Sequence, residues 1–134
     1  MKYTIFILLG ALFLACDEND VMPAYEKKSA VTTTVASLSV SNEEPGSGET
    51  ITLTLMYVNP TSDPLESVAL KAKVGSGDYI TLQSFDGQSS EKDVEIIEEV
   101  QYVAPSAGAE VIFDMVITSQ KENPLIKRTS ITVE

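Results

Sequence analysis

The clearest pattern along the chain is a strict alternation of apolar and polar residues from Glu49 to Val58. The apolar positions are Ile51, Leu53, Leu55 and Tyr57, and threonine or methionine stands between them. A period of two with β-branched residues predicts a half-buried strand. Residues rich in glycine, proline, asparagine and serine bound it at 43–48 and 59–64, and these predict turns.

The same alternation recurs further along the chain, at 68–74, 111–117 and 129–133, and a further short strand is expected at 79–82. The apolar side of 111–117 is expected in the core, which leaves Asp114, Ile112 and Val116 on the opposite face. Exposed apolar residues on a sheet face can mark a docking surface, and a covering loop is the alternative. In residues 31–40 the apolar set changes parity, so we expect a β-bulge or a kink near Ala36-Ser37.

Residues 91–104 fit two patterns. Their apolar spacing also suits a helix, which Ser90 and Asp93 would cap. Their valine and isoleucine content and the surrounding strands favour a strand. Counting gives about seven strands separated by turn signals, which predicts a single all-β antiparallel sandwich. Over Ala30 to Glu134 this pattern resembles the immunoglobulin-like domains, including PKD-like ones, of bacterial surface lipoproteins, without the cysteine pair and tryptophan of antibody domains.

The start of the chain has the layout of a secretory signal. Lys2 is followed by the apolar run Ile5 to Leu14 and then by Ala15-Cys16. The acidic residues after Cys16 end this run, and it is too short for a membrane-spanning helix, which needs about 20 apolar residues. We therefore expect the segment to target the chain for export without spanning a membrane.

This junction resembles the lipobox of bacterial lipoproteins, with Phe13 where the family prefers leucine. The resemblance implies cleavage before Cys16 and attachment of more than one acyl chain to it. The expected divisions are a signal peptide at 1–15, an acylated cysteine with a flexible tether at 16–29, and the domain at 30–134. The acidic run at 17–20 resembles a signal for surface display on the outer membrane, and a solvated linker is its alternative.

Composition excludes several function classes. The net charge of −11 argues against nucleic acid as a partner and against lying flat on an anionic membrane. Cys16 is the only cysteine, so no disulfide can form within the chain, and no histidine is present. We expect no cofactor and no catalysis. The carboxylate pairs Glu43-Glu44 and Glu98-Glu99 are neighbours, which on a strand point to opposite faces.

The sequence offers candidates for two kinds of binding site. Four aspartates in or beside predicted loops are calcium candidates, because calcium is held by loop oxygens. They are Asp63, Asp78, Asp86 and Asp93. No EF-hand run accompanies them, and aspartate also favours turns for local reasons. Tyr79 and Phe85 flank a short predicted strand and are candidates for an exposed aromatic platform, with core or rim packing as the alternative.

The sequence thus predicts a lipid-anchored surface lipoprotein with a non-catalytic binding or spacer domain. Its expected partners are the membrane, through the anchor, and other envelope proteins or glycans, including an accessory role in glycan capture. The alternatives are a pilus or adhesion subunit, completed by a neighbour's strand, and a calcium-binding adhesive domain. Lys127 and Arg128 on the last predicted strand resemble edge protection against such pairing.

Overall fold

The computed structural model describes residues 34–60, 65–86, 92–119 and 123–134, and the side chain of Asp86 is outside this description. The signal peptide and tether predicted for 1–29, with Cys16, lie outside the described residues. Those residues contain seven strands and no helix that could cross a membrane. The strands are β1 (Val35–Val40), β2 (Thr50–Val58), β3 (Leu65–Val74), β4 (Ile80–Asp86), β5 (Glu95–Val103), β6 (Glu110–Ser119) and β7 (Leu125–Thr132).

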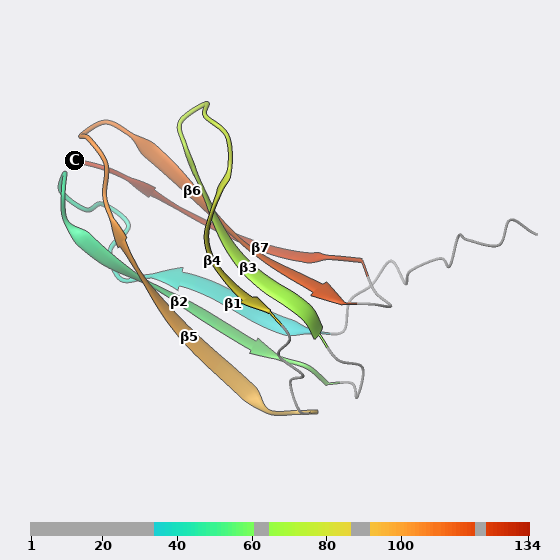
Figure 1. The fold of residues 1–134 in the computed structure, drawn as a ribbon. Coiled ribbons are helices and arrows are strands. Elements are labelled where there is room, and N and C mark those ends of the chain that lie inside the picture. The colour runs from blue at the N-terminus through green and yellow to red at the C-terminus, as the bar shows by residue number, and fades with distance from the viewer. Residues whose placement is uncertain (1–33, 61–64, 87–91, 120–122) are drawn as a thin grey trace, which may run out of the picture.

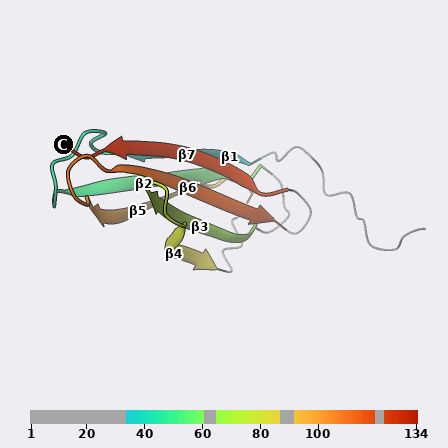
Figure 2. The ribbon, with the colours of Figure 1, turned by 90° about the horizontal axis from the view of Figure 1, so that it is seen from above.

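The strands form two antiparallel sheets that pack face to face. One sheet has the order β1-β2-β5 and the other the order β4-β3-β6-β7. Figures 1 and 2 show the two layers from perpendicular directions. The predicted all-β sandwich is therefore confirmed, and residues 95–103 form a strand and not a helix.

The core lies between the sheets and is built from the alternating apolar positions. In β2, Ile51, Leu53, Leu55 and Tyr57 are all buried, as the pattern predicts. In β6, Phe113 is fully buried and its ring meets that of Tyr102 on β5 edge to face, with centroids 5.0 Å apart. This contact ties the two sheets together, and burial of one such large side chain stabilises the fold by about 2 kcal/mol.

The prediction of a bulge in the first strand is wrong. β1 pairs with β2 in continuous register from Val35 opposite Val58 to Val40 opposite Leu53. Leu38 and Val40 face the core, whereas Val35 faces outward and is 59% exposed. An apolar residue on the solvent side, not a distortion of the strand, explains the mixed pattern in the described part of this segment.

A bulge occurs instead between β3 and β4. Leu70 pairs with Gln83 but Lys71 pairs with Thr81, so Leu82 is an extra residue on β4. A bulge of this kind interrupts the ladder and increases the local twist. β4 is consequently an irregular edge of the four-stranded sheet.

The two flanks of the sandwich differ. On the flank formed by β1 and β7, hereafter the closed flank, the two edge strands lie against each other. The backbone N–H groups of Thr132 and Glu134 also donate to the carbonyls of Glu43 and Pro45, both at 2.9 Å. On the flank formed by β4 and β5, hereafter the open flank, both strands are sheet edges. The described residues therefore cover one pair of sheet edges more fully than the other.

Candidate functional site

The candidate site lies on the outer face of the four-stranded sheet, around Asp114 in the middle of β6. Phe113 and Met115 on either side point into the core, so Asp114 points outward by the period of the strand. It is nevertheless only 5% exposed. A buried carboxylate needs a counter-charge and hydrogen bonds, because transfer out of water otherwise disfavours its ionised form.

Arg128 on β7 provides both. The register of β6 and β7 places Arg128 directly opposite Asp114. Its Nε donates to Oδ1 at 2.7 Å and its Nη2 donates to Oδ2 at 2.8 Å. This bidentate geometry is the strongest form of ion pair between these groups. The hydrogen bonds from Arg128 hold the pKa of Asp114 below its usual value, and the carboxylate in turn raises the pKa of Arg128.

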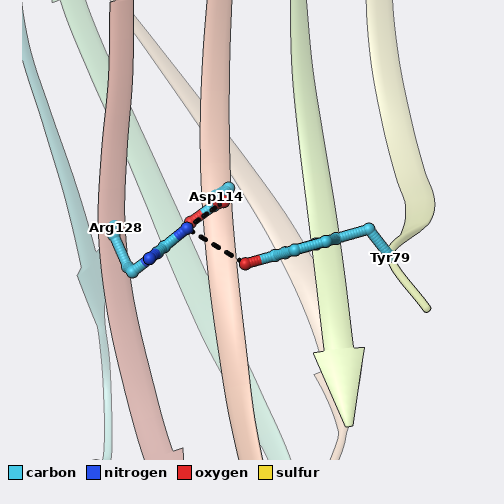
Figure 3. A network of polar contacts seen from close by, with 3 residues as sticks. All are labelled: Tyr79, Asp114 and Arg128. Atoms are coloured by element: carbon cyan, nitrogen blue, oxygen red, sulfur yellow. Dashed lines mark hydrogen bonds and ion pairs between the residues drawn. The ribbon is translucent and has the colours of Figure 1, made fainter. Parts of the chain in front are cut away.

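Tyr79 reaches the same pair from the turn between β3 and β4. Gly75 has a φ of 54°, a conformation that suits glycine, and its N–H donates to the carbonyl of Glu110 at 2.8 Å. The Tyr79 side chain lies across β3, and its hydroxyl accepts a hydrogen bond from Arg128 Nη2 at 3.1 Å (Figure 3). Burial, and after it the neighbouring Asp114 carboxylate, raises the pKa of Tyr79.

Two lysines on β3 complete the site. Lys71 stands opposite Asp114 across β3 and β6, so the carboxylate lies in register between Lys71 and Arg128. The Nζ of Lys73 lies 5.6 Å from the centroid of the Tyr79 ring, which is within the range of a cation–π contact. We call Lys71, Lys73, Tyr79, Asp114 and Arg128 the cationic face.

The two sheets differ in their charged residues, and the outer face of the four-stranded sheet bears Glu110 and Asp114 beside its lysines and arginine. Of the five lysines and arginines that the structure describes, all but Lys92 belong to β3 or β7. The described strands of the other sheet contain no lysine or arginine, and their outer face bears Glu95 and Glu99, which stand opposite Val58 and Thr54. A cationic surface on a chain of net charge −11 is a local feature that composition alone conceals.

The ionisation and hydrogen bonds of Asp114 bear on the chemistry that this face can offer. The lowered pKa keeps Asp114 ionised, so it is a weak proton donor, and both of its oxygens are bonded to Arg128. The lysines and the partly exposed Tyr79 offer positive charge and an aromatic surface to a ligand. Such groups bind carboxylates or sugars without taking part in a reaction.

The structure separates the two aromatic residues that the sequence singled out. Tyr79 is 40% exposed and lies on the outer face, whereas Phe85 stands opposite Val68 and packs against the core. They therefore do not form one platform. Tyr79 belongs to the cationic face, and Phe85 has the packing role that the sequence analysis gave as the alternative.

The calcium candidates are divided between the two ends of the sandwich. Asp78 follows β3 at one end, and Asp93 precedes β5 at the other (Figure 1). Asp93 adopts a φ of 62°, and its N–H donates to the carbonyl of Asn59 at 2.8 Å. Asp63 and the side chain of Asp86 lie outside the description. Within the described ranges, no three carboxylate or cysteine side chains gather where they could hold a metal ion.

Sequence reasoning placed Asp114 outward but did not pair it, and it assigned Arg128 only to edge protection. β7 is indeed an edge strand, but the guanidinium group of Arg128 is hydrogen-bonded to Asp114. Lys127 is exposed although its register opposite Met115 puts it on the inner side, which is how edge strands are protected. The available signal was parity, since Lys71 and Asp114 alternate with core residues and Arg128 has the parity opposite to that of the buried Ile131.

Comparisons with known proteins show the fold. No protein family matches the sequence, and no match to a curated protein is found. The solved structure of Spo0M, a sporulation control protein from Bacillus subtilis, matches 78% of this chain with a TM-score of 0.58 and 13% identity, and the match covers 50% of Spo0M. A β-glucosidase from Erythrobacter marinus matches 77% of the chain with a TM-score of 0.57 and 10% identity, over 16% of the enzyme.

A third structure is covered almost completely. The CARDB domain of a Pyrococcus furiosus protein, solved in complex with di-metal ions, matches 82% of this chain and 98% of that domain, with a TM-score of 0.54 and 11% identity. The chain thus spans about half of Spo0M and a small part of the glucosidase but the whole of a single domain. At these identities the comparisons establish an immunoglobulin-like β-sandwich and leave its role to be argued from the site.

Proposed function

We propose that the chain is an exported lipoprotein, anchored through Cys16 to the outer membrane and displayed at the cell surface. Its β-sandwich is a non-catalytic binding module. The observation that carries the proposed binding role is the cationic face, which gathers Lys71, Lys73 and Arg128 around an exposed tyrosine on a strongly acidic chain.

The direction of the strands supports display of this face. β1 begins at one end of the domain, and β3, β5 and β7 begin at the same end (Figure 1). A tether from Cys16 would join the domain at this end. The Gly75–Tyr79 turn and Glu134 lie at the opposite end. The cationic face runs along the side of the domain and is accessible from solution.

The ligand chemistry that fits the face is an acidic glycan. Lysine side chains bind the carboxylate of a uronic acid as point charges, and a tyrosine ring packs against the apolar face of a sugar. Arg128 holds Tyr79 in place by its hydrogen bond and is itself fixed by Asp114. This pre-ordered arrangement reduces the entropy lost when a ligand binds.

A binding assay against acidic and neutral polysaccharides tests the proposal. We expect binding to an acidic glycan that falls by at least about tenfold in a Lys71→Gln/Lys73→Gln variant, since each lost charge contact is worth up to about 1 kcal/mol. Lys92→Gln removes an exposed lysine outside this face and is the matched control. Equal binding by all three proteins, or binding to none of the acidic glycans, would contradict a ligand site on the cationic face.

A further inference from the structure

The open flank exposes β5 as the edge of the three-stranded sheet. β5 is nine residues long and pairs along its whole length with β2, from Glu95 opposite Val58 to Val103 opposite Thr50. Alternate N–H and C=O groups of an edge strand point away from its neighbour and are available to a further strand. Nothing that the structure describes is paired with this side of β5.

The side chains of β5 provide contact area on both faces of the sheet edge. Ile97 and Val103 point outward and are 56% and 61% exposed. Ile96 and Tyr102 point inward and are only partly buried against the core. An added strand would place its own alternating side chains beside both pairs, which is how a peptide gains affinity from an exposed sheet edge.

The charge of β5 limits what can be added. Glu95, Glu98 and Glu99 lie on this strand, which contains no lysine or arginine. Two copies of β5 side by side would bring six carboxylates together, and like charges across strands are destabilising. An acidic edge therefore resists pairing with a second copy of itself and favours a basic strand.

Glu98 makes this selection more stringent. Its side chain has inward parity opposite Leu55 and is half-buried. Burial, and after it the charge of Glu98, raises the pKa of the nearby Tyr57. An added strand would bury Glu98 further. Without a cation from that strand, the buried carboxylate would lose its hydration without compensation. Inward-pointing charges on edges protect against uncharged strands in the same way.

The other three edges are less suitable. β4 carries the bulge at Leu82, which interrupts its ladder. β1 and β7 lie on the closed flank, where the segment at Glu43–Pro45 already bonds to the end of β7. Length, regularity and charge thus single out β5.

We propose that β5 binds an extended basic segment of a partner protein, which adds to the three-stranded sheet as an antiparallel strand. The spacing of the glutamates on β5 defines the complementary pattern. In an antiparallel pair, two adjacent cations of the partner lie opposite Glu99 and then Glu98. A third cation, four residues after the one opposite Glu99, lies opposite Glu95. The two intervening residues are apolar and pack beside Ile97 and Ile96. This interaction uses the face and edge away from Lys71 and Arg128 and does not depend on the lipid anchor.

The probe is the nine-residue peptide Val-Val-Thr-Val-Lys-Lys-Val-Val-Lys, added to the full chain in detergent. We expect hydrogen exchange to slow at alternate amides of β5 alone. Affinity should fall at least about tenfold when threonine replaces the three lysines, because three cross-strand charge pairs are lost. It should fall by a similar factor when alternate peptide amides are N-methylated, because these supply the strand hydrogen bonds.

The protein variants separate charge at β5 from overall charge. Glu98→Gln/Glu99→Gln should weaken binding about fivefold, whereas Glu43→Gln/Glu44→Gln, which neutralises an adjacent pair in the loop after β1, should leave it unchanged. If the methylated peptide bound as tightly as the unmethylated one, the interaction would depend on surface charge and not on strand hydrogen bonds. This result would overturn the proposal. So would the absence of binding, new protection in β4, or a dimer protected at β5 without peptide.

Discussion

Asp114 and Arg128 face each other across β6 and β7 and form a bidentate ion pair at 2.7 and 2.8 Å. The carboxylate stands between Ile112 and Val116 on a strand whose other central residues are apolar. Its burial at this position depends on the arginine opposite it. The same arginine bonds to Tyr79, so one register relationship organises the whole cationic face.

Replacing Asp114 by alanine should destabilise the domain by about 1–2 kcal/mol. Two charge-assisted hydrogen bonds are lost, but the side chain of Arg128 is 58% exposed and regains water. Urea unfolding measures this change. Lys92→Ala is the control, because it breaks an exposed pair at 4.0 Å and should leave the free energy of unfolding unchanged. Equal effects of the two substitutions would show that the Asp114 pair adds nothing.

The ion pair also predicts a pH dependence. Because Arg128 lowers the pKa of Asp114 in the folded state, its stabilisation is present above the usual value of 3.8 and is lost as the pH falls through the lowered one. Hydrogen bonds to Asn42 and Gly46 lower the pKa of Glu49 in the same direction. The free energy of unfolding, followed from pH 7 to pH 2, should therefore fall less in Asp114→Asn than in the parent. The part of the fall that is due to Glu49 should remain. An equal fall in stability at low pH in this variant and in the parent would contradict a role of Asp114 in it.

Tyr57→Phe should stabilise the domain, which is the unusual direction for a core substitution. The Tyr57 hydroxyl is buried and has no hydrogen-bond partner among the described residues. Removing an unsatisfied buried group recovers about 1 kcal/mol, and phenylalanine fills nearly the same volume. Burial raises the pKa of Tyr57, so the variant should also resist unfolding above pH 10 better than the parent. Thermal unfolding at pH 7 and pH 11 checks both effects, and a lower melting temperature at pH 7 would refute them.

Gly75→Ala should destabilise the turn that carries Tyr79 by about 1 kcal/mol, because alanine is strained at a φ of 54°. A Cβ at Gly75 would meet no atom within 4 Å, so the strain comes from the backbone alone. Gly46→Ala is the matched control, since its Cβ would have room and its φ is not positive. Urea unfolding of both variants compares them, and equal losses would argue against the turn conformation described for Gly75.

Alternation along the chain predicted most of the strands and most of the core, and at 91–104 the valine and isoleucine content decided for a strand. Ile51 to Tyr57 and Val111 to Ile117 were assigned to the correct face, because a strand with one buried face needs a period of two. It failed at Val35, which is apolar and outward, so the sequence predicted a bulge where the pairing is regular. Hydrophobicity alone does not distinguish an exposed valine from a core valine.

The cationic face could not be predicted, because it depends on which strands are neighbours. Lys71, Asp114 and Arg128 lie far apart in the sequence and meet only through the order β3-β6-β7 and its register. Tyr79 reaches them from a turn, where alternation has no meaning. Parity supplied the correct face for each strand residue, and the missing information was the topology of the sheet.

The mass of the exported protein tests the central claim most directly. The chain is to be expressed with its first sixteen residues intact in a bacterium that processes lipoproteins, extracted in detergent and measured whole. We predict a product that begins at Cys16, carries more than one acyl chain and partitions into the detergent phase. An unmodified, water-soluble product that begins at another residue would contradict anchoring, and with it the proposed display of the domain at the cell surface.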